Sequence, residues 1–449
     1  MLRAHGGSPR GRAKNYVDPA AERLSPLLSQ LVNYERTRPD RRLWDLATMQ
    51  RLLARPGAIP APRPAVQVGG SKGKGTTCAA LAGLVQASGG RAGVYSSPHV
   101  TTLCERIRVG CADIEVAVLE RILRDLLAVP GERAPTFFEA MTLAAAEHFA
   151  AERVDLAIWE VGLGGRFDAT TALPVDASIV TTIELEHTDV LGDTIAAIAG
   201  EKAPVIRPGG VGFTGTTGEA LAVIRAHAAA DSARLFALGE HFGLRDVVWS
   251  PAGARGRLWL PDGRELPFAL PDAAAFELPA LALAAAAFAH LLPHRRLVLD
   301  PAPRRSMPCR FEVHSEPDGE VLVFDGAHTE ESLRAVATEL RRRWPDRRPA
   351  VLFASATGKR WREGLSRLLP LADSFVVTEL SDIPSEDPAI IAAFLAGAGA
   401  RSEVAADAVS GLAALRRRPG PRLVVGSFYL AGRVRELVGI ETKPCRTAK

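Results

Sequence analysis

The 449-residue chain has few cysteines, and their arrangement forms no motif. They are Cys78, Cys104, Cys111, Cys309 and Cys445. Because they are odd in number, scattered and without a CxxC pair, they indicate neither a disulfide framework nor a zinc site. We therefore expect a reducing, cytoplasmic compartment.

The sequence also lacks a hydrophobic run long enough to cross a bilayer. The apolar run at 278–289 is short and dominated by alanine, which predicts a buried helix and no membrane contact. Residues 1–14 are basic and contain glycine and proline without an apolar core, so we expect a disordered tail rather than a signal peptide. Residues 441–449 look similar, and we expect a second tail there.

Aromatic residues are scarce, at 6% of the chain, and the charge is nearly balanced. The 55 basic and 51 acidic residues give a net charge of +4 and are spread along the sequence. Two arginine clusters, 341–343 and 416–418, stand out, but no aromatic side chains alternate with them. We interpret both as solvated helix faces and expect no nucleic-acid partner.

The chain does contain enough apolar material for more than one core, because 47% of its residues are hydrophobic. Between 64 and 207, short β-branched runs alternate with longer amphipathic ones, as is typical of a mostly parallel sheet covered by helices. We expect an α/β fold with a tail and lead-in at 1–30, a first unit at 31–296, a smaller α/β unit at 297–437 and a tail at 438–449.

A phosphate-binding loop is predicted where a strand at 66–68 runs into a glycine-rich turn and then a helix at 78–87. Small residues let backbone N–H groups close around phosphate oxygens, the helix N-terminus adds a favourable dipole, and the central lysine supplies a point charge. Thr76 or Thr77 can reach Mg²⁺. The spacing departs from the common Walker pattern, and a glycine-rich turn with an incidental lysine is the alternative. The expected phosphate-binding residues are Gly70, Ser71, Lys72, Gly73, Lys74, Gly75, Thr76 and Thr77.

Two further strand ends carry acidic residues and an imidazole. The apolar run 156–160 ends at Glu160 before a glycine-rich loop, and the run 178–182 leads into the segment 184–189 with His187. The carboxyl ends of parallel strands share one edge of a sheet, where the phosphate loop also lies. Oxygen ligands and one imidazole beside phosphates suit Mg²⁺, and Glu160 is the strongest metal candidate. The alternatives are a helix-capping glutamate and a solvated histidine.

Nine segments follow one another as a series of motifs. They are GSKGKGT (70–76), YSSPH (95–99), ERIRV (105–109), TFFE (136–139), EVGLGGRFDAT (160–170), HT (187–188), EKA (201–203), DGAH (325–328) and GSFYL (426–430). In this order they resemble the motifs of the folylpolyglutamate synthase/dihydrofolate synthase family of Mur ligases. The resemblance extends over nearly the whole chain.

The resemblance implies an N-terminal P-loop ATPase domain, a smaller Rossmann-like C-terminal domain and an ATP-dependent ligase. A folate carboxylate would be phosphorylated by ATP with Mg²⁺, and the amino group of L-glutamate would then attack the acyl phosphate. The carboxylate substrate would be dihydropteroate, a folate, or both. Because family members are usually monomeric, we expect a monomer.

The resemblance also assigns roles to single residues. Lys74 would hold the ATP phosphates. Lys202 falls on a lysine that is typically carbamylated in the family, and an ordinary surface lysine near a helix start is the alternative. Mg²⁺ would be ligated, directly or through water, by Ser97, Glu160 and His187. The pterin or folate pocket would be lined by Thr136, Phe138, Asp168 and Ala169. On domain closure the nucleotide would be met by Arg310, Asp325 and His328.

The chain departs from the family at several motif positions. Lys72, Thr171 and Thr329 stand where asparagine is usual, the Gln/Asn pair near the nucleotide base is not visible in 277–283, and the usual Asp-Lys-Asp is Gly-Lys-Arg at 358–360. Two other hypotheses are a divergent Mur-type ligase acting on a non-folate carboxylate and a nucleotide-binding protein without ligase activity. The lysines, acids and histidines retained in the motifs argue against the latter.

Overall fold

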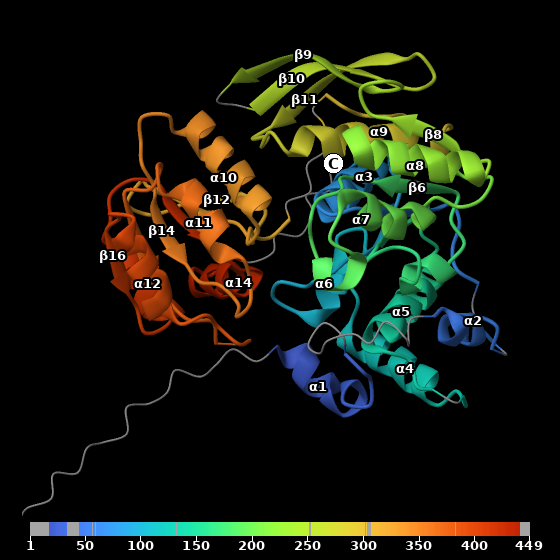
Figure 1. Ribbon diagram of the computed structural model, residues 1–449. Coiled ribbons are helices and arrows are strands. Elements are labelled where there is room, and N and C mark those ends of the chain that lie inside the picture. The colour runs from blue at the N-terminus through green and yellow to red at the C-terminus, as the bar shows by residue number, and fades with distance from the viewer. Residues whose placement is uncertain are drawn as a thin grey trace, which may run out of the picture.

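The computed structural model describes residues 18–33, 45–55, 57–58, 60–131, 133–250, 253–300, 302, 307–381 and 383–440. The expected tails at 1–14 and 441–449, with Cys445, lie outside the described residues. Two α/β units stand side by side, with the first unit in blue to yellow and the second in orange to red (Figure 1). The expected fold class, a mostly parallel sheet followed by a smaller α/β unit, is confirmed.

The first unit is built on an eight-stranded sheet in the order β4-β3-β2-β5-β1-β6-β7-β8. Its strands are parallel except for β3 and β4, which add an antiparallel edge. The central strands are buried along their whole length, because helices cover both faces. The strands are β1 (Ala65–Gly69), β2 (Ala92–Tyr95), β3 (Ile107–Val109), β4 (Ala112–Asp113), β5 (Leu156–Glu160), β6 (Ala177–Val180), β7 (Val211–Thr214) and β8 (Arg234–Ala237).

Alternate residues of the central strands pack into two separate hydrophobic cores. Val66 and Ile158 face the core beneath α3 and α9, whereas Ala157 and Trp159 face the core beneath α4 and α5. This is the period-two alternation of a strand. The helices of the unit are α1 (Pro19–Leu28), α2 (Ala47–Leu53), α3 (Lys74–Ala87), α4 (Val116–Leu127), α5 (Phe137–Ala151), α6 (Thr188–Leu191), α7 (Ile195–Lys202), α8 (Gly218–Ala230) and α9 (Glu277–Leu291), with 3₁₀ turns at Leu103–Arg106, Ala169–Ala172 and Ala203–Val205.

Two of these helices bear on the sequence predictions. The alanine-rich α9 is buried against α3, as expected, and none of the helices in the described ranges is long and apolar enough to cross a bilayer. Residues 18–30, placed with the lead-in, contain α1, whose Ala20 and Leu24 belong to the core beneath α4 and α5. That helix is therefore packed as part of the first unit.

A three-stranded antiparallel sheet lies above α9 (Figure 1), where the sequence predicted short strands with turns. Its strands are β9 (Gly243–Ser250), β10 (Gly253–Trp259) and β11 (Glu265–Pro271). Apolar residues of β10 and β11, among them Leu258 and Phe268, join the core that contains α3 and α9. This small sheet therefore covers one side of the packed pair α3 and α9, of which α3 follows the phosphate loop.

The second unit is a six-stranded sheet in the order β12-β13-β17-β14-β15-β16, parallel except for β12. Its two faces are again covered, by α10 to α12 on one side and by α13 and α14 on the other. The elements are β12 (Glu312–Ser315), β13 (Val321–Phe324), α10 (Glu330–Arg343), β14 (Ala350–Phe353), α11 (Trp361–Leu368), β15 (Ser374–Val377), α12 (Pro388–Gly397), β16 (Ser402–Val404), α13 (Ala408–Arg416), β17 (Arg422–Val425) and α14 (Phe428–Leu437).

The arginines at the end of α10 connect the two units. Arg342 donates to the carbonyl of Ala273 at 2.8 Å, and Arg343 donates to the carbonyl of Asp272 at 2.7 Å. Both guanidinium groups also pair with Glu339, whose side chain is buried. The interpretation of 341–343 as a solvated helix face is therefore wrong for two of its three arginines, because a tertiary contact engages them.

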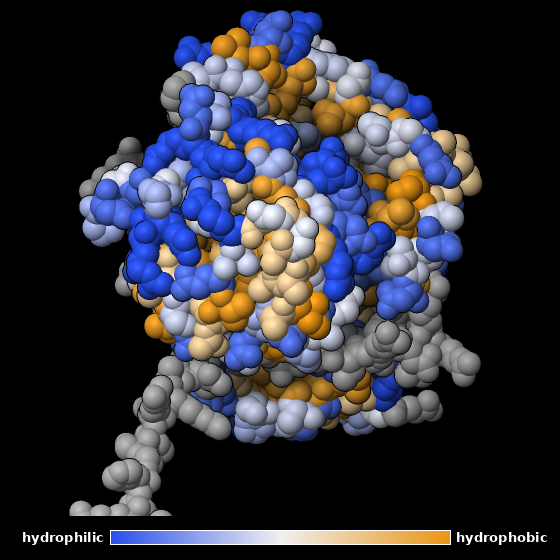
Figure 2. All heavy atoms as spheres, turned by 60° about the vertical axis from the view of Figure 1, so that its left-hand side comes forward, coloured by the Kyte–Doolittle hydropathy of each residue, from blue (hydrophilic) through white to orange (hydrophobic). Residues whose placement is uncertain are grey.

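The face of the second unit carries hydrophilic side chains around an apolar area near its centre (Figure 2). The arginines at 416–418 lie on this unit and pair with Glu316 and Glu403. Large apolar side chains are exposed singly, for example Ile390 and Val404. Scattered exposure of this kind is ordinary for a folded protein.

Candidate active site

The phosphate loop connects β1 to α3, and two glycines give it its shape. Gly73 caps α3 with a φ of +82°, so the helix begins at Lys74, four residues before the predicted start. Gly70 has a φ of +132°, and a Cβ atom there would clash with the hydroxyl of Thr181. Backbone N–H groups at the start of α3 therefore lie at a helix N-terminus directly after a glycine turn, which is an anion-binding arrangement.

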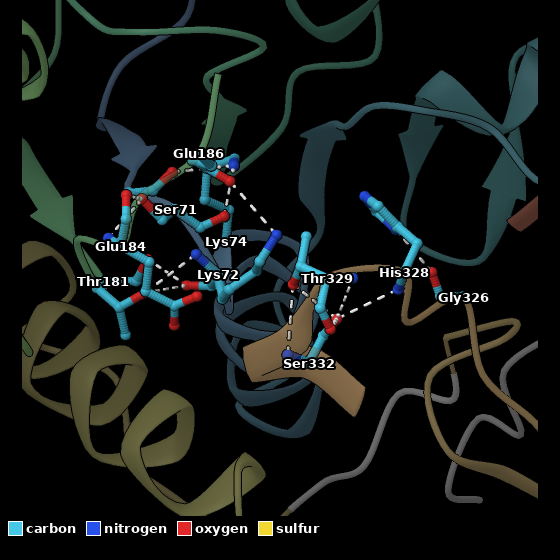
Figure 3. A network of polar contacts seen from close by, with 12 residues as sticks. Ser71, Lys72, Lys74, Thr181, Glu184, Glu186, Gly326, His328, Thr329 and Ser332 are labelled. Carbon is cyan, nitrogen blue, oxygen red and sulfur yellow. Dashed lines mark hydrogen bonds and ion pairs between the residues drawn. The ribbon is translucent and has the colours of Figure 1, made fainter. Parts of the chain in front are cut away.

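The end of β6 holds this loop from behind. The Ser71 N–H donates to the carbonyl of Thr182 at 2.7 Å, and the Lys72 N–H donates to the hydroxyl of Thr182 at 3.0 Å. The Thr181 hydroxyl donates to the carbonyl of Lys72 at 2.6 Å (Figure 3). Two threonines at one strand end thus fix the loop backbone, a role that the sequence reasoning did not assign to them.

Three lysines and one glutamate surround the loop. Lys74 Nζ donates to the carbonyls of Gly70 and Ser71, at 3.0 and 3.4 Å. Lys202 Nζ donates to the same Gly70 carbonyl at 3.1 Å. These contacts concentrate positive charge on the loop where the anionic ligand is predicted.

Glu186 joins two of these lysines into one cluster. Its carboxylate pairs with Lys202 at 3.1 Å and with Lys72 at 3.3 Å. Burial alone would raise the pKa of Glu186, but the charges of Lys202, Lys74 and Lys72 outweigh it and lower that pKa to about 2. Glu186 is ionised at neutral pH, and the sequence reasoning did not select it from the 184–189 segment.

Lys202 is not a surface lysine, although it does precede the 3₁₀ turn Ala203–Val205. It ends α7, its side chain is 2% exposed, and burial together with the charge of Lys74 lowers its pKa to about 8. The Lys202 ammonium therefore loses its proton more readily than an ordinary lysine. An amine of this kind is available for chemistry near neutral pH.

Glu160 ends β5 beside the loop and is only weakly hydrogen-bonded. Among the described residues, its carboxylate accepts one hydrogen bond, from the Ser97 N–H at 3.3 Å. Burial raises the pKa of Glu160, although Lys74 and Arg310 act in the opposite direction. A buried carboxylate with so few hydrogen-bond donors has most of its negative charge uncompensated.

The first turn of α3 contains a second buried polar group that is short of partners among the described residues. The hydroxyl oxygen of Thr77 is buried and has no hydrogen-bond partner within the described part of the chain. Buried polar atoms are almost always paired, so an orphan of this kind suggests a missing ligand or water. Glu160, Thr77 and the open loop therefore fit a nucleotide accompanied by a divalent cation.

His187 and Ser97, the other predicted metal ligands, lie on loops at the same edge. His187 caps the short α6 with a φ of +48°, and burial lowers the pKa of its imidazole, so it is neutral at pH 7. In the described ranges no three His, Cys, Asp or Glu side chains converge to hold a metal ion. A cation here would need phosphate oxygens and water to complete its shell, as Mg²⁺ commonly does.

The predicted folate-side residues gather around Gly162. The N–H of Gly162 donates to Asp168 at 2.9 Å, and a Cβ at Gly162 would lie 2.7 Å from the ring of Phe138. Thr136 caps α5, the helix that carries Phe138, and Ala169 is buried in the 3₁₀ turn after Asp168. The structure therefore brings these residues together on one side of the phosphate loop's sheet.

Asp168 is engaged by its own loop. Its carboxylate accepts backbone N–H groups from Gly162, Leu163 and Thr170 at 2.9, 3.1 and 3.0 Å, as well as the Thr170 hydroxyl. Burial nevertheless raises its pKa. These bonds fold the segment after β5, and they give Asp168 an organising role that the sequence alone did not reveal.

The second unit carries an acid and an imidazole after β13, and the imidazole faces the loop. Asp325 follows β13 and accepts from the N–H groups of Phe311 and Ala327, each at 2.7 Å, and burial raises its pKa to about 6. His328 lies opposite Lys72 with Thr329 between them (Figure 3). Burial and the charge of Lys72 lower the pKa of His328 to about 4, so its ring is neutral at pH 7.

A cavity of about 340 Å³ opens between the units beside the phosphate loop. Thr76 of the first turn of α3 lies in its wall, as does Arg310, whose guanidinium stacks on the ring of Phe428 at 4.2 Å. The remaining wall comes from α3, β11, α9 and β12, from residues just before α9 and β12, and from Arg343 at the end of α10. The cavity therefore adjoins the start of α3, where the phosphate-binding loop ends.

Comparison with known proteins agrees with this geometry. Over 315 residues the chain is 33% identical to the dihydrofolate synthase/folylpolyglutamate synthase of Escherichia coli strain K12, which covers 69% of this chain and 70% of that protein. This chain belongs to the dihydrofolate synthase/folylpolyglutamate synthase family. Residues 309–426 of this family member also match the model of the Mur ligase, glutamate ligase domain.

Two further proteins are similar to this chain over most of its length. The chain is 34% identical over 413 residues to a probable bifunctional folylpolyglutamate synthase/dihydropteroate synthase of Haloferax volcanii, covering 86% of this chain but 48% of that protein. The chain thus spans about half the length of that relative. A crystal structure of the Yersinia pestis bifunctional folylpolyglutamate synthase/dihydrofolate synthase, complexed with AMPPNP and Mn ion, superposes with a TM-score of 0.78 at 27% identity. That match covers 96% of this chain and 100% of the other.

Proposed function

We propose that this protein is an ATP-dependent ligase that joins the amino group of L-glutamate to the carboxylate of dihydropteroate, of a folate, or of both. The observation that carries the proposal is the position of the phosphate loop. Lys74 and Lys202 donate to it, and His328, from a unit that matches the glutamate ligase domain, faces Lys72 of the loop. Nucleotide and glutamate ligation would then meet at one interface.

The chemistry requires activation of a poor electrophile. A carboxylate resists attack by an amine, whereas its acyl phosphate carries a good leaving group. In the proposed reaction the loop N–H groups and Lys74 hold the phosphates, and Arg310 contributes a further cation from the second unit. Neutral His328 adds no charge, and apposition of the two units excludes water from the reactive phosphate.

The proposed cofactor is Mg²⁺, a hard cation that neutralises phosphate charge when it is bound. Glu160 would hold it, with Ser97 and His187 acting directly or through water. The support is physical: Glu160 is buried with few donors, and a cation beside it would compensate its charge. Separately, the Thr77 hydroxyl in the first turn of α3 has no partner among the described residues.

Lys202 is proposed as the family's carbamylated lysine. Its pKa of about 8 makes the neutral amine, the form that reacts with carbon dioxide, more available than in an ordinary lysine. Carbamylation would convert a cation into an anion beside Glu186, so the modified side chain would need a compensating cation. The proposal therefore predicts that activity rises with added bicarbonate and that Lys202→Arg abolishes this response.

The folate pocket is proposed at Thr136, Phe138, Asp168 and Ala169. Phe138 offers a ring that meets Tyr95 at 5.4 Å between centroids, and flat pterin rings stack on such surfaces. Asp168 would shape this pocket through its loop. We further propose a cytoplasmic monomer divided near residue 297, which gel filtration and limited proteolysis would test.

The deciding experiment measures ADP release by the purified protein with ATP, Mg²⁺ and L-glutamate. Dihydropteroate, tetrahydrofolate and no acceptor are compared, and product masses are recorded. A gain of one glutamate on dihydropteroate shows dihydrofolate synthase activity, and the same gain on tetrahydrofolate shows polyglutamylation. If neither acceptor supports ADP release although the protein binds the nucleotide, the proposal is contradicted and a ligase for a non-folate carboxylate is favoured.

A further inference from the structure

We infer that Gln67 is a positioning residue of the proposed ligase: its buried carboxamide fixes the folate-side loop (residues 161–171) to the strand that leads into the phosphate loop. Gln67 lies on β1, outside the motif segments. The inference rests on the proposed function, in which the carboxylate substrate binds along the folate-side loop and is phosphorylated at the phosphate loop.

Gln67 occupies a position where the pattern of β1 predicts an apolar residue. Ala65, on the same face of the strand, belongs to the core beneath α4 and α5, whereas Val66 and Val68 belong to the core beneath α3 and α9. Gln67 is 0% exposed. Because a carboxamide in the centre of a sheet is costly unless its polar atoms are hydrogen-bonded, the partners of Gln67 must account for its place there.

The carboxamide meets this requirement with three hydrogen bonds. Its Nε2 donates to the hydroxyl oxygens of Thr170 and Thr171, at 2.8 Å each. Its Oε1 accepts from the guanidinium of Arg207 at 2.7 Å. A guanidinium can only donate, so a flipped amide would place its own N–H groups against Arg207. One orientation of the Gln67 side chain therefore satisfies all three bonds.

The two threonines continue the connection into the folate-side loop. The Thr170 hydroxyl donates to the Asp168 carboxylate, and the Thr171 hydroxyl donates to the carbonyl of Gly165 at 2.6 Å. Asp168 in turn accepts the N–H of Gly162 at 2.9 Å. A continuous set of hydrogen bonds thus runs from the interior of β1 to the start of the loop. Buried networks of this kind hold one geometry, because their bonds polarise one another in a low dielectric.

Arg207 connects the same network to a third element. It follows the 3₁₀ turn Ala203–Val205 and also donates to the carbonyl of Pro204 at 3.4 Å. Burial lowers the pKa of Arg207 to about 10, with the charge of Asp168 acting in the opposite direction, so the guanidinium is charged at neutral pH. Gln67 therefore lies between the folate-side loop and the segment that follows α7.

The phosphate loop is held by a different set of bonds. Thr181 and Thr182 contact its backbone from the end of β6, and none of those bonds involves Gln67 or the folate-side loop. Loss of the Gln67 bonds should therefore release the folate-side loop and leave the nucleotide side in place. Since a misplacement of about 1 Å can cost about 10²-fold in rate, such a release is measurable.

The test compares Gln67→Leu with wild type in steady-state kinetics, with dihydropteroate or tetrahydrofolate as the acceptor. Leucine is of similar size and removes all three bonds. We expect the KM of the acceptor to rise and kcat to fall by about tenfold each, while the dissociation constant of ADP with Mg²⁺ changes by less than about twofold. Unchanged acceptor kinetics, or an equal loss of ADP affinity, would overturn the inference.

A milder variant keeps the test decisive if Gln67→Leu does not fold. Thr171→Val removes one bond to Gln67 and one to the Gly165 carbonyl, and leaves the Arg207 contact with Gln67 in place. We expect the same split between acceptor and nucleotide, with effects of about threefold on the acceptor side. The absence of that split in Thr171→Val would also overturn the inference.

Ser178 provides the matched control, because it is paired with Gln67 on the neighbouring strand β6 and is also buried. Its hydroxyl donates to the carbonyl of Val205 at 2.6 Å, so Ser178→Ala removes a buried hydrogen bond from the same sheet without altering a contact of the folate-side loop. It should lower the urea midpoint and keep acceptor KM and kcat within about twofold of wild type. A kinetic split like that of Gln67→Leu would assign the effect to general destabilisation and overturn the inference.

Hydrogen exchange separates the inference from the proposed function, because it needs no substrate. In Gln67→Leu, the amides of 162–171 should exchange at least about tenfold faster than in wild type, while those of 70–76 keep their wild-type rates. If wild type turns over no folate acceptor, the ligase proposal fails, and this exchange pattern still supports the fixing of the loop by Gln67. Equal acceleration in both loops, or none at 162–171, overturns it.

Discussion

Two buried carboxylates at the carboxyl edge of one sheet differ in how much of their charge the protein compensates. Asp168 accepts three backbone N–H groups between 2.9 and 3.1 Å, along with a hydroxyl. Glu160 accepts one backbone N–H at 3.3 Å. Burial raises the pKa of both groups, so both would be costly if left unpaired.

The difference separates a structural acid from the carboxylate that we propose binds a cation. The donors on Asp168 come from its own loop, so its charge is used in folding the segment after β5. Glu160 faces Lys74 and Arg310 at long range, and its carboxylate remains short of close partners. A site that takes up a cation with each nucleotide requires a carboxylate whose charge the protein leaves largely uncompensated.

We expect the largest effect from removing Lys74, whose charge acts on Glu160. Lys74→Ala removes the charge held against the Gly70 and Ser71 carbonyls, and we expect turnover to fall by about 10³-fold or more. Pterin binding, measured by fluorescence quenching, should persist because the folate-side residues are untouched. Unchanged turnover would contradict the assignment of the loop.

A paired substitution breaks the comparison directly. Asp168→Asn replaces an anion that accepts three N–H groups by an amide, and we expect the free energy of unfolding in urea to fall by about 3 kcal/mol. Glu160→Gln is the matched control, because it removes an under-compensated charge. Its unfolding free energy should not decrease, while turnover falls by more than about 10²-fold. Equal destabilisation of the two variants would refute the distinction.

The third prediction concerns acid stability of the cluster of Lys72, Glu186 and Lys202. The folded-state pKa of Glu186 is lowered to about 2, below its usual 4.5, so the unfolded chain binds more protons in this interval. Its contribution is therefore complete above pH 4.5 and is lost as the pH falls toward 2. Relative to Glu186→Gln, we expect the wild-type advantage in urea unfolding to shrink by about 2 kcal/mol between pH 6 and pH 3. A constant difference across this range would contradict the ion pairing.

The smallest expected effect belongs to Lys72, which is partly exposed and contacts Glu186 at 3.3 Å. Lys72→Asn should raise the KM for ATP by about fivefold with little change in kcat, since a partly screened charge is worth about 1 kcal/mol. The effect should weaken in 0.5 M salt, where charges are screened more strongly. Steady-state kinetics at two salt concentrations would check both statements, and a loss in kcat alone would argue against a phosphate-facing role.

Local pattern was enough to predict the strand, loop and helix around Lys74 and the strand-end position of Glu160. These features depend on residues adjacent in the chain, and glycine spacing and β-branched runs report them. The start of α3 at Lys74 was missed because Gly73 caps it through its backbone conformation, without a capping side chain.

Tertiary contacts explain the remaining differences. Glu186, Thr181 and Thr182 meet the loop from more than a hundred residues away, and no local signal distinguishes Glu186 from Glu184. Arg342 and Arg343 resemble a solvated cluster in sequence, yet they hold the segment before α9. Which polar residue is buried depends on the packing of distant elements, and the periodicity of one segment does not contain that information.

The most direct test of the account is binding of Mn²⁺ to wild type and to Glu160→Gln, followed by electron paramagnetic resonance with and without a non-hydrolysable ATP analogue. We expect wild type to bind Mn²⁺ tightly only when the analogue is present, and the glutamine variant to lose at least about tenfold in this affinity while remaining folded. Equal Mn²⁺ affinity in the two proteins would contradict the claim that Glu160 is the carboxylate awaiting a cation.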